Sequence, residues 1–423
     1  LWVSFDGGAR WHRWTHGVPT TSVMDLVVHP RDQDLVIATH GRAMYIVDDI
    51  SPLREMSAET LAEPIHLYAS GPSMLYQRRQ GGGVRGGGAG EYQGENRPYG
   101  AFITYSLNSP GLPLQDDEKE RERKEAERAA AARAQSRPDE STGKKEVAMA
   151  AAAPADAGEK KPDKEPKVEI RITDASGKLL RKMEGPAKLG VNRAVWDFGR
   201  DAYRRPPTDS RGRPRDRDSG PAVPPGTYNV TVKYGQQEAK GTINVEADPA
   251  LGLSDSDWQA REAAVTRAGD LQNAVADAVN RIIAARDDVK AVLAKIDTRK
   301  KEREQRAGGA DAEDPDKALA QSARQLQKKL GDMERRLYIP PDVKGIVEDL
   351  TAQNDVEYAG RTLGALSKPT PNAQAYLAKA ERNVQGALAD FNKLFAEDVA
   401  AFQKQVADAG IGLLASQRPI EVK

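Results

Sequence analysis

The chain has 423 residues, which at about 150 residues per domain predicts about three domains. Its 63 Lys and Arg residues balance its 63 Asp and Glu residues, so no net charge draws the whole chain to nucleic acid or to an anionic membrane. The lack of cysteine excludes disulfides, thiolate metal sites and a cysteine nucleophile, and no apolar run of about 18 residues is present to span a bilayer.

Residues 1–56 alternate short apolar runs with turn residues, which predicts an antiparallel meander. The expected strands are 1–5, 22–29, 35–39 and 43–47. Because the first residue is Leu rather than Met and a strand begins there at once, we expect the chain to be part of a longer protein. Any signal peptide would then lie upstream.

The turn after the first strand fits the pattern Ser-x-Asp-x-Gly-x-x-Trp, which is formed by Ser4, Asp6, Gly8 and Trp11. An Asp carboxylate in this place can accept backbone N–H groups of a tight turn, and Gly can adopt a positive φ. The Trp can then fold back over the hairpin. These residues resemble the Asp-box, or bacterial neuraminidase repeat, of the β-propellers of sialidases, some endoglucanases and sortilin-type receptors. Arg10 stands where that motif usually has Thr.

The Asp-box resemblance implies that residues 1–56 are the end of a β-propeller, and that the motif is a fold element away from the central site of the propeller. Residues 38–53 also resemble the end of the propeller in large bacterial Asp-box and sortilin-like repeat proteins. A lone blade cannot bury its own faces, so we expect the remainder of the propeller to be a partner.

His40 and Gly41 are expected to form the turn between two strands, and Asp48 and Asp49 to close the last strand. His40 with Asp48 or Asp49 is conceivable as a metal or acid/base pair, but a turn and a strand exit explain the same residues. The five histidines of the chain show no metal-ligand spacing.

Residues 57–99 are expected to be a connector with a flexible loop, because two Gly-Gly-Gly runs lie there among arginines. A phosphate-binding loop is the alternative, but neither a Gly-Lys-Ser/Thr ending nor a strand-turn-helix context accompanies the glycines. Residues 115–166 are rich in Glu, Lys, Arg, Ala and Pro without an apolar stripe, which predicts a disordered charged insert.

Residues 100–247 resume strand-like alternation on both sides of this insert and predict a β-sandwich. The residues with a clear physical task are Asn192, Trp196, Asp197, Pro225, Gly226 and Tyr228. They resemble the small Ig-like domain of the flagellar hook-capping protein and of C-terminal modules of many secreted bacterial proteins. Trp196 would fill the core, and Pro225-Gly226 would turn into a strand from which Tyr228 points inward. The arginines between 200 and 217 indicate either a basic patch or, as we favour, a mobile charged loop.

Residues 248–423 are predicted to form an antiparallel helical bundle that begins with N-capping side chains at 254–257. Apolar residues then recur every seven positions, at Ala268, Val275, Ile282, Val289 and Ile296. A second seam covers 319–337, a weaker helix 343–366 and a fourth helix 373–406. Gln272 and Arg286 interrupt the first seam and indicate wet positions or bundle ends. The seam could instead bind another chain, but internal packing is more economical.

The sequence therefore predicts a multidomain β-then-α chain with a terminal propeller blade, an Ig-like sandwich and a helical bundle. Every motif is a fold motif, so no catalytic residue, cofactor or metal is assigned. We expect a binding or assembly scaffold in a large bacterial protein, exported to the periplasm or beyond the cell, with a protein or glycan partner. Accessory domains of a propeller glycoside hydrolase, with paired carboxylates outside these residues, are the alternative. A coiled-coil adaptor is a third.

Overall fold

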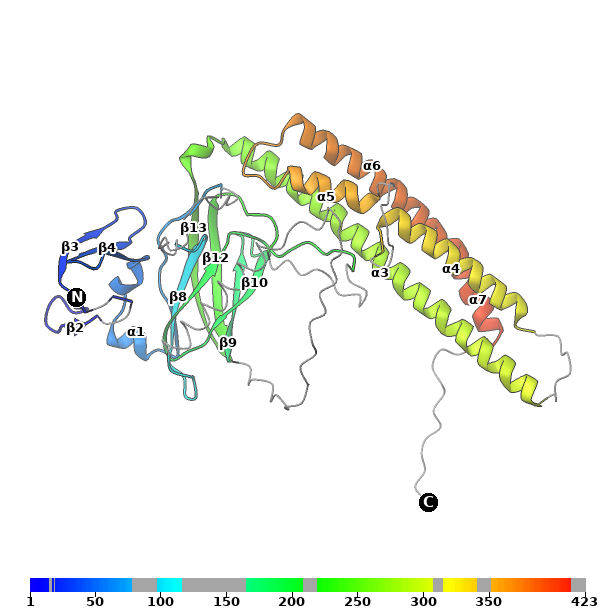
Figure 1. Cartoon of the computed structure of the whole chain (residues 1–423), viewed down its shortest axis with the longest axis horizontal. Coiled ribbons are helices and arrows are strands. Elements are labelled where there is room, and N and C mark those ends of the chain that lie inside the picture. Colours follow the sequence, from blue (N-terminus) through cyan, green and yellow to red (C-terminus); the bar gives the residue numbers. More distant parts are fainter. Residues whose placement is uncertain are drawn as a thin grey trace, which may run out of the picture. The chain divides into compact units, whose positions relative to one another are not determined.

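The computed structural model describes residues 1–14, 17–18, 20–77, 97–115, 165–207, 219–306, 315–340 and 351–411. The chain forms two compact units. The first comprises Leu1–Met74, Tyr92–Asp197 and Gly226–Glu246, and the second Leu75–Glu91, Phe198–Pro225 and Ala247–Lys423. Strands fill the first part of the sequence and helices the last, so the predicted β-then-α multidomain order is confirmed (Figure 1).

Several predictions concern residues outside the described set. They are the glycine-rich loop within 78–96, the charged insert at 116–164, the arginine-rich segment at 208–218, the turn between the first two helices at 307–314 and the start of the third helix at 341–350.

The first unit begins with two small antiparallel sheets. In one, β1 (Trp2–Val3) pairs with β2 (His12–Arg13). In the other, β3 (Val23–Val28), β4 (Leu35–Thr39) and β5 (Met44–Val47) form a three-stranded meander. The strands expected from the apolar runs are thus present, with ends that differ by a few residues.

Residues 57–99 were expected to be a connector, but their described part holds a helix and two strands. Helix α1 (Ala58–Ala62) begins with a capping box in which Ser57 and Thr60 each bond the backbone N–H of the other. Strands β6 (Ile65–Leu67) and β7 (Ser73–Leu75) join the two sheets that follow. Three-residue strands are too short to show a period of two, which is why the sequence did not reveal them.

Two further sheets form the larger part of the first unit. Their strands are β8 (Ala101–Leu107), β9 (Lys167–Thr173), β10 (Leu179–Pro186), β11 (Gly190–Trp196), β12 (Gly226–Tyr234) and β13 (Gln237–Ala247). One sheet has the order β10-β9-β12-β13-β7 and the other the order β11-β8-β6. The partner of β8 does come after the insert, as β11, but β6 from before the insert pairs with β8 as well.

The core of these sheets is made by alternate residues of β9, β11, β12 and β13, whereas β8 is buried along its whole length. Trp196 on β11 is fully buried and meets Tyr228 on β12 edge to face, with ring centroids 5.3 Å apart. The Tyr105 hydroxyl of β8 donates to the Pro186 carbonyl of β10 at 2.6 Å. Side chains of both sheets therefore share one interior, and burial of each large apolar side chain contributes roughly 1.5–3 kcal/mol.

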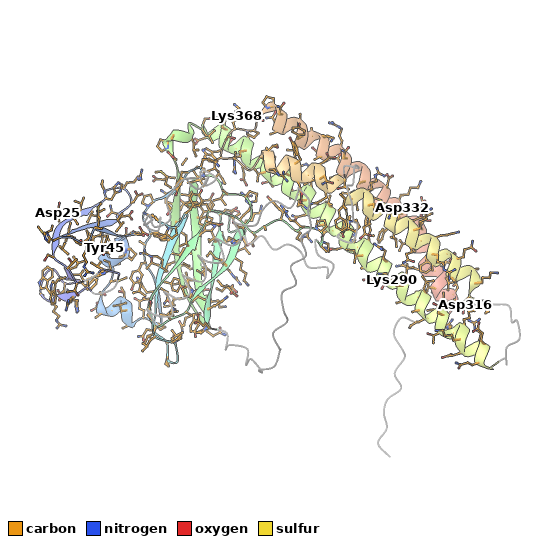
Figure 2. All side chains as sticks on the ribbon, in the orientation of Figure 1. Asp25, Tyr45, Lys290, Asp316, Asp332 and Lys368 are labelled. Carbon is orange, nitrogen blue, oxygen red and sulfur yellow. The ribbon has the colours of Figure 1, made fainter. Side chains whose placement is uncertain are left out.

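The second unit is built on helix α3 (Asp255–Arg306), whose 52 residues span about 78 Å at 1.5 Å per residue. Its first turn is closed by Ser254 and Asp257, which each accept the backbone N–H of the other. Hydrogen bonds from the Ser254 hydroxyl and the Lys368 ammonium, in that order, lower the pKa of Asp257 to about 2. Lys368 is labelled in Figure 2.

Two shorter helices follow α3 in sequence and return along it. They are α4 (Lys317–Leu337) and α5 (Ala352–Thr362). A last helical run lies against the others and consists of α6 (Pro371–Leu394), a π-helical turn (Phe395–Val399) and α7 (Ala400–Asp408) (Figure 1). Three side-chain pairs show that the chain returns along α3 in the opposite direction. They are Arg303 with Asp316, Arg286 with Glu334, and Gln272 with Gln353.

The heptad seam of α3 is buried inside this bundle, as predicted for internal packing. Both interruptions of the seam have partners on another helix within the length of the bundle, so neither is a bundle end. The Arg286 side chain is 31% exposed, as expected for a wet position, whereas Gln272 is buried. The Gln272 side-chain amide exchanges hydrogen bonds of 2.9 and 3.2 Å with that of Gln353. Arg286 pairs with the buried carboxylate of Glu334. These polar pairs between helices fix which layers of the bundle face each other.

The described arginines of the arginine-rich loop are paired with acids of the helices. Arg200 contacts Glu262 on α3 at 2.8 Å, and Arg204 contacts Asp277 on α3 at 2.5 Å. The segment Phe198–Pro225, expected inside the sandwich, accordingly belongs to the helical unit. In this described part, Arg200 and Arg204 are thus paired with acids of α3 and do not form a free basic patch.

Gly269→Ala tests the close contact between the Tyr203 ring and helix α3. The Tyr203 ring lies across Gly269, and an alanine Cβ there would be 1.9 Å from the Tyr203 Cζ atom. Gly→Ala within a helix normally stabilises by about 1 kcal/mol. Here we expect a net loss, because overpacking costs about 1–3 kcal/mol.

The matched control is Gly331→Ala in α4, where nothing lies within 4 Å of the added methyl group. Calorimetric unfolding of the full chain should show a higher transition temperature for Gly331→Ala and a lower one for Gly269→Ala. A Gly269→Ala protein as stable as the control would contradict the packing of Tyr203 on α3.

Candidate functional site

The turn between β1 and β2 has the hydrogen bonds that its sequence pattern predicts. Asp6 Oδ1 accepts the Arg10 backbone N–H at 2.8 Å and the Ser4 hydroxyl at 2.8 Å. Ser4 Oγ in turn accepts the Gly8 N–H at 2.8 Å. These bonds, with that from Arg10 first, lower the pKa of the Asp6 carboxyl from its ordinary 3.8. Asp6 therefore serves as a turn acceptor and is poorly suited to donate a proton.

The glycines and the tryptophan of this motif also take the expected places. Gly7 and Gly8 have φ of 67° and 95°. Trp11 folds back over the turn, and its Cζ2 atom would be 3.8 Å from a Cβ on Gly8. The indole nevertheless remains 60% exposed, so it does not act as a buried plug in this chain.

One face of the β3-β4-β5 meander is an exposed apolar surface. The pairing register places five apolar residues and one acid on it: Val27, Val36, Ala38, Met44, Ile46 and Asp25. Met44 and Ile46 are 62% and 60% exposed, and Val27 is 55% exposed. Figure 2 labels Asp25 on this face and Tyr45, which the register places on the other. Exposed apolar patches of this kind mark places where another surface packs.

The opposite face of the meander is apolar as well. Ile37 is fully buried there, whereas Leu26 and Val28 of the edge strand β3 are exposed. Strands with apolar residues on both sides are typical of sheets that are covered on both faces. The meander thus has the composition of an interior layer while one face remains open. We call Val27, Val36, Ala38, Met44 and Ile46 the open apolar face.

Arg193 ties the end of the meander to the larger sheets. Its guanidinium donates to the Asp48 and Asp49 carbonyls at 2.7 and 2.8 Å. It also donates to Thr104 Oγ1 of β8 at 3.0 Å and lies over the Phe102 ring at 4.8 Å. The partners of Arg193 are about 145 and 89 residues away in sequence, so no local pattern indicated this contact.

A second arginine reinforces the same junction. Arg97 also lies over the Phe102 ring, at 4.7 Å, and pairs with the Asp34 carboxylate at 2.9 Å. Asp34 additionally accepts the backbone N–H of Asp49 at 2.9 Å. The carboxylate of Asp34 is therefore engaged by a cation and a backbone donor at once.

A cleft of about 1080 Å³ opens beside this junction within the first unit. Its lining includes Trp14, Pro52, Leu53 and Met56, together with the start of β11 and the two residues before it, Lys188–Arg193. Polar side chains of the lining are mostly engaged; Asn192, for example, bonds the backbone of Lys188 and Gly190.

The Asp48 carboxylate is the exception in the cleft. It is half-buried and lines the cleft, yet none of the described residues donates a hydrogen bond to it. Burial first, and then the negative charge of Asp34, raise the pKa of this carboxyl above its ordinary 3.8. An acceptor in this state gains from any ligand that brings a hydrogen-bond donor.

The six residues singled out in the sandwich serve the core and the turns. Trp196 and Tyr228 are buried between the sheets, and Asn192 closes the loop that leads into β11. Pro225 and Gly226 stand at the turn where β12 begins, and Asp197 lies exposed after β11. None of the six gathers with other polar groups into a separate site: Asn192 alone lines the cleft.

In the described part of the chain, no three His, Asp or Glu side chains are grouped to hold a metal ion. The helices described here are too short or too polar to cross a membrane. Comparison with models of protein families, with curated proteins and with solved structures finds no match for the chain.

Asp48→Asn tests the environment of the unpaired carboxylate. A pKa raised in the folded state means that ionisation of Asp48 opposes folding as the pH rises. We expect Asp48→Asn to raise the transition temperature of the first unit at pH 7. The gain should shrink as the pH falls and vanish below 3.8, where Asp48 is protonated in the folded and unfolded states.

Calorimetry of the full chain over this pH range measures the effect, with Asp25→Asn as the control. Asp25 is exposed on the same meander, so its replacement should change stability by no more than about 0.5 kcal/mol. A loss of stability in Asp48→Asn at pH 7 would contradict the environment described here.

Proposed function

We propose that the chain is a non-catalytic binding or assembly scaffold, the C-terminal part of a large exported bacterial propeller protein. In this proposal residues 1–56 are the end of an Asp-box propeller, residues 100–247 an Ig-like sandwich and residues 248–423 a supporting bundle. The observation that carries the proposal is the open apolar face of the β3-β4-β5 meander.

The open apolar face is evidence for the proposed neighbouring propeller blade, which would pack against it. Propeller blades are four-stranded sheets that pack face to face around an axis. The meander supplies three such strands, with apolar side chains on both faces. The bonded turn at Ser4, Asp6 and Gly8 agrees with the geometry that the Asp-box pattern implies.

The larger sheets support the Ig-like interpretation. Two antiparallel sheets share a core around Trp196 and Tyr228, as in small β-sandwiches. The seam of α3 is occupied by helices of the same chain, which favours a supporting bundle over a coiled-coil adaptor. Binding by the chain would therefore take place on strands and loops of the first unit.

The glycoside hydrolase alternative requires two carboxylates free to act on one sugar. In the junction, Asp34 is engaged by Arg97 and by a backbone N–H, and Asp6 is held in its turn. Only Asp48 among these three lacks a hydrogen-bond donor from the described residues. The alternative places its paired carboxylates outside these residues, so the sequence upstream of Leu1, rather than these aspartates, tests it.

The proposal is tested by charging the open apolar face in two contexts. Met44→Lys with Ile46→Lys should leave the 423-residue chain folded, because both side chains are already exposed, and should reduce its self-association and its binding of apolar dyes. In the longer protein, read from the frame upstream of Leu1, the same change buries unpaired charges and should cost at least about 3 kcal/mol.

The control is Leu179→Lys, which charges an apolar residue that is 47% exposed on β10 and should behave alike in both contexts. Denaturant unfolding and sedimentation measure the outcome. A reading frame that begins at Leu1, or equal effects of the double change in both contexts, would refute the propeller neighbour.

A further inference from the structure

We propose that the cleft beside Asp48 binds a neutral oligosaccharide, with a sugar ring packed on Trp14 and a sugar hydroxyl donating to the Asp48 carboxylate. This inference rests on the scaffold function proposed above and names the class of its ligand. It is argued from the size of the cleft, its charges and the state of Asp48.

The size and apolar lining of the cleft fit a ligand of several rings. Its volume of about 1080 Å³ slightly exceeds the range of about 300–1,000 Å³ that is ordinary for ligand pockets. Trp14, Pro52, Leu53 and Met56 give it an apolar wall. Pyranose rings present apolar C–H faces that pack on indole rings, while their edges carry hydroxyl groups.

The charges that line the cleft nearly cancel. Four acids and three bases face it: Asp48, Asp49, Glu165, Glu184, Lys167, Lys188 and Arg193. Lys167 and Glu184 form a pair at 2.5 Å, and Asp49 accepts the Ser51 backbone N–H at 3.1 Å. A strongly anionic or cationic ligand gains little in such surroundings, whereas a neutral polar ligand has no charge to desolvate.

The Asp48 carboxylate fixes where the ligand must place a donor. It is half-buried in the cleft and receives no hydrogen bond from the described residues. A hydroxyl of the ligand would supply that bond and ease the burial of the charge. A basic side chain of a protein partner is the competing donor, but Arg97 and Arg193 already act on Asp48 with positive charge.

The experiment is isothermal titration of the full chain with five neutral hexasaccharides, those of β-linked glucose, α-linked glucose, xylose, mannose and N-acetylglucosamine. We expect at least one to bind with a Kd of about 1 mM or tighter. Asp48→Asn should weaken it about 10-fold, because the sugar hydroxyl then bonds a neutral amide oxygen in place of a charged carboxylate. Trp14→Ala should remove it.

The matched controls are Asp25→Asn and Trp2→Ala, which alter an exposed acid and an exposed indole outside the cleft lining and should leave binding unchanged. Loss of binding in Trp14→Ala has a second explanation, which is local unfolding of the region. This explanation does not apply to Asp48→Asn, because that variant is expected to be more stable at neutral pH.

Each of the following outcomes either supports or overturns the proposed sugar site. Binding that is weakened about 10-fold in Asp48→Asn, lost in Trp14→Ala and kept in both controls supports the inference. Binding kept in Asp48→Asn and Trp14→Ala, no binding of any hexasaccharide, or binding of hexalysine that Asp48→Asn abolishes, overturns it. Chromatography of the ligand after incubation separates this inference from the scaffold function: cleavage to shorter sugars would refute the non-catalytic function while leaving the ligand class intact.

Discussion

A sheet with apolar side chains on both faces requires a layer on each side, and the rest of the first unit depends on that requirement. The meander β3-β4-β5 has one layer, since Ile37 is buried, while Met44 and Ile46 remain exposed on the open apolar face. Hydrophobic burial at roughly 25 cal/mol per Å² makes an uncovered face of this kind costly in water. The proposed propeller neighbour answers this requirement with a second layer of the same chemistry.

Polar contacts tie the end of the meander to the larger sheets. Arg193 bonds two consecutive carbonyls at the end of β5, and Arg97 holds Asp34 at the same place. Guanidinium groups can bridge a gap that aliphatic side chains would have to fill, because they bond several acceptors at once. The cleft is the space that remains beside these arginine contacts. The contacts that join the meander to the larger sheets therefore also shape the candidate site.

Sequence patterns predicted those features of the fold that depend on residues close together in the chain. The bonded turn at Asp6, the inward alternation around Tyr228 and the heptads of α3 each depend on residues a few positions apart. The strands β6 and β7, the Arg193 junction and the polar pair of Gln272 with Gln353 do not, since each needs a partner brought in by the fold. The cleft belongs to this second class, because its walls come from segments more than 100 residues apart.

Two aspartates show why the cleft, and not the recognisable motif, is the place to look for binding. Asp6 stands in the motif, accepts two hydrogen bonds and has a lowered pKa, so its chemistry is complete within the turn. Asp48 lies outside the Asp-box pattern, at the strand exit in residues 38–53, where its carboxylate accepts no hydrogen bond from the described residues and has a raised pKa. Burial of the Asp48 charge costs stability, so a fold selected for stability alone would favour an uncharged residue at position 48. Residues that break a local rule in this way are often functional. In the proposed complex, a sugar hydroxyl would give this carboxylate the hydrogen bond that the described residues do not supply.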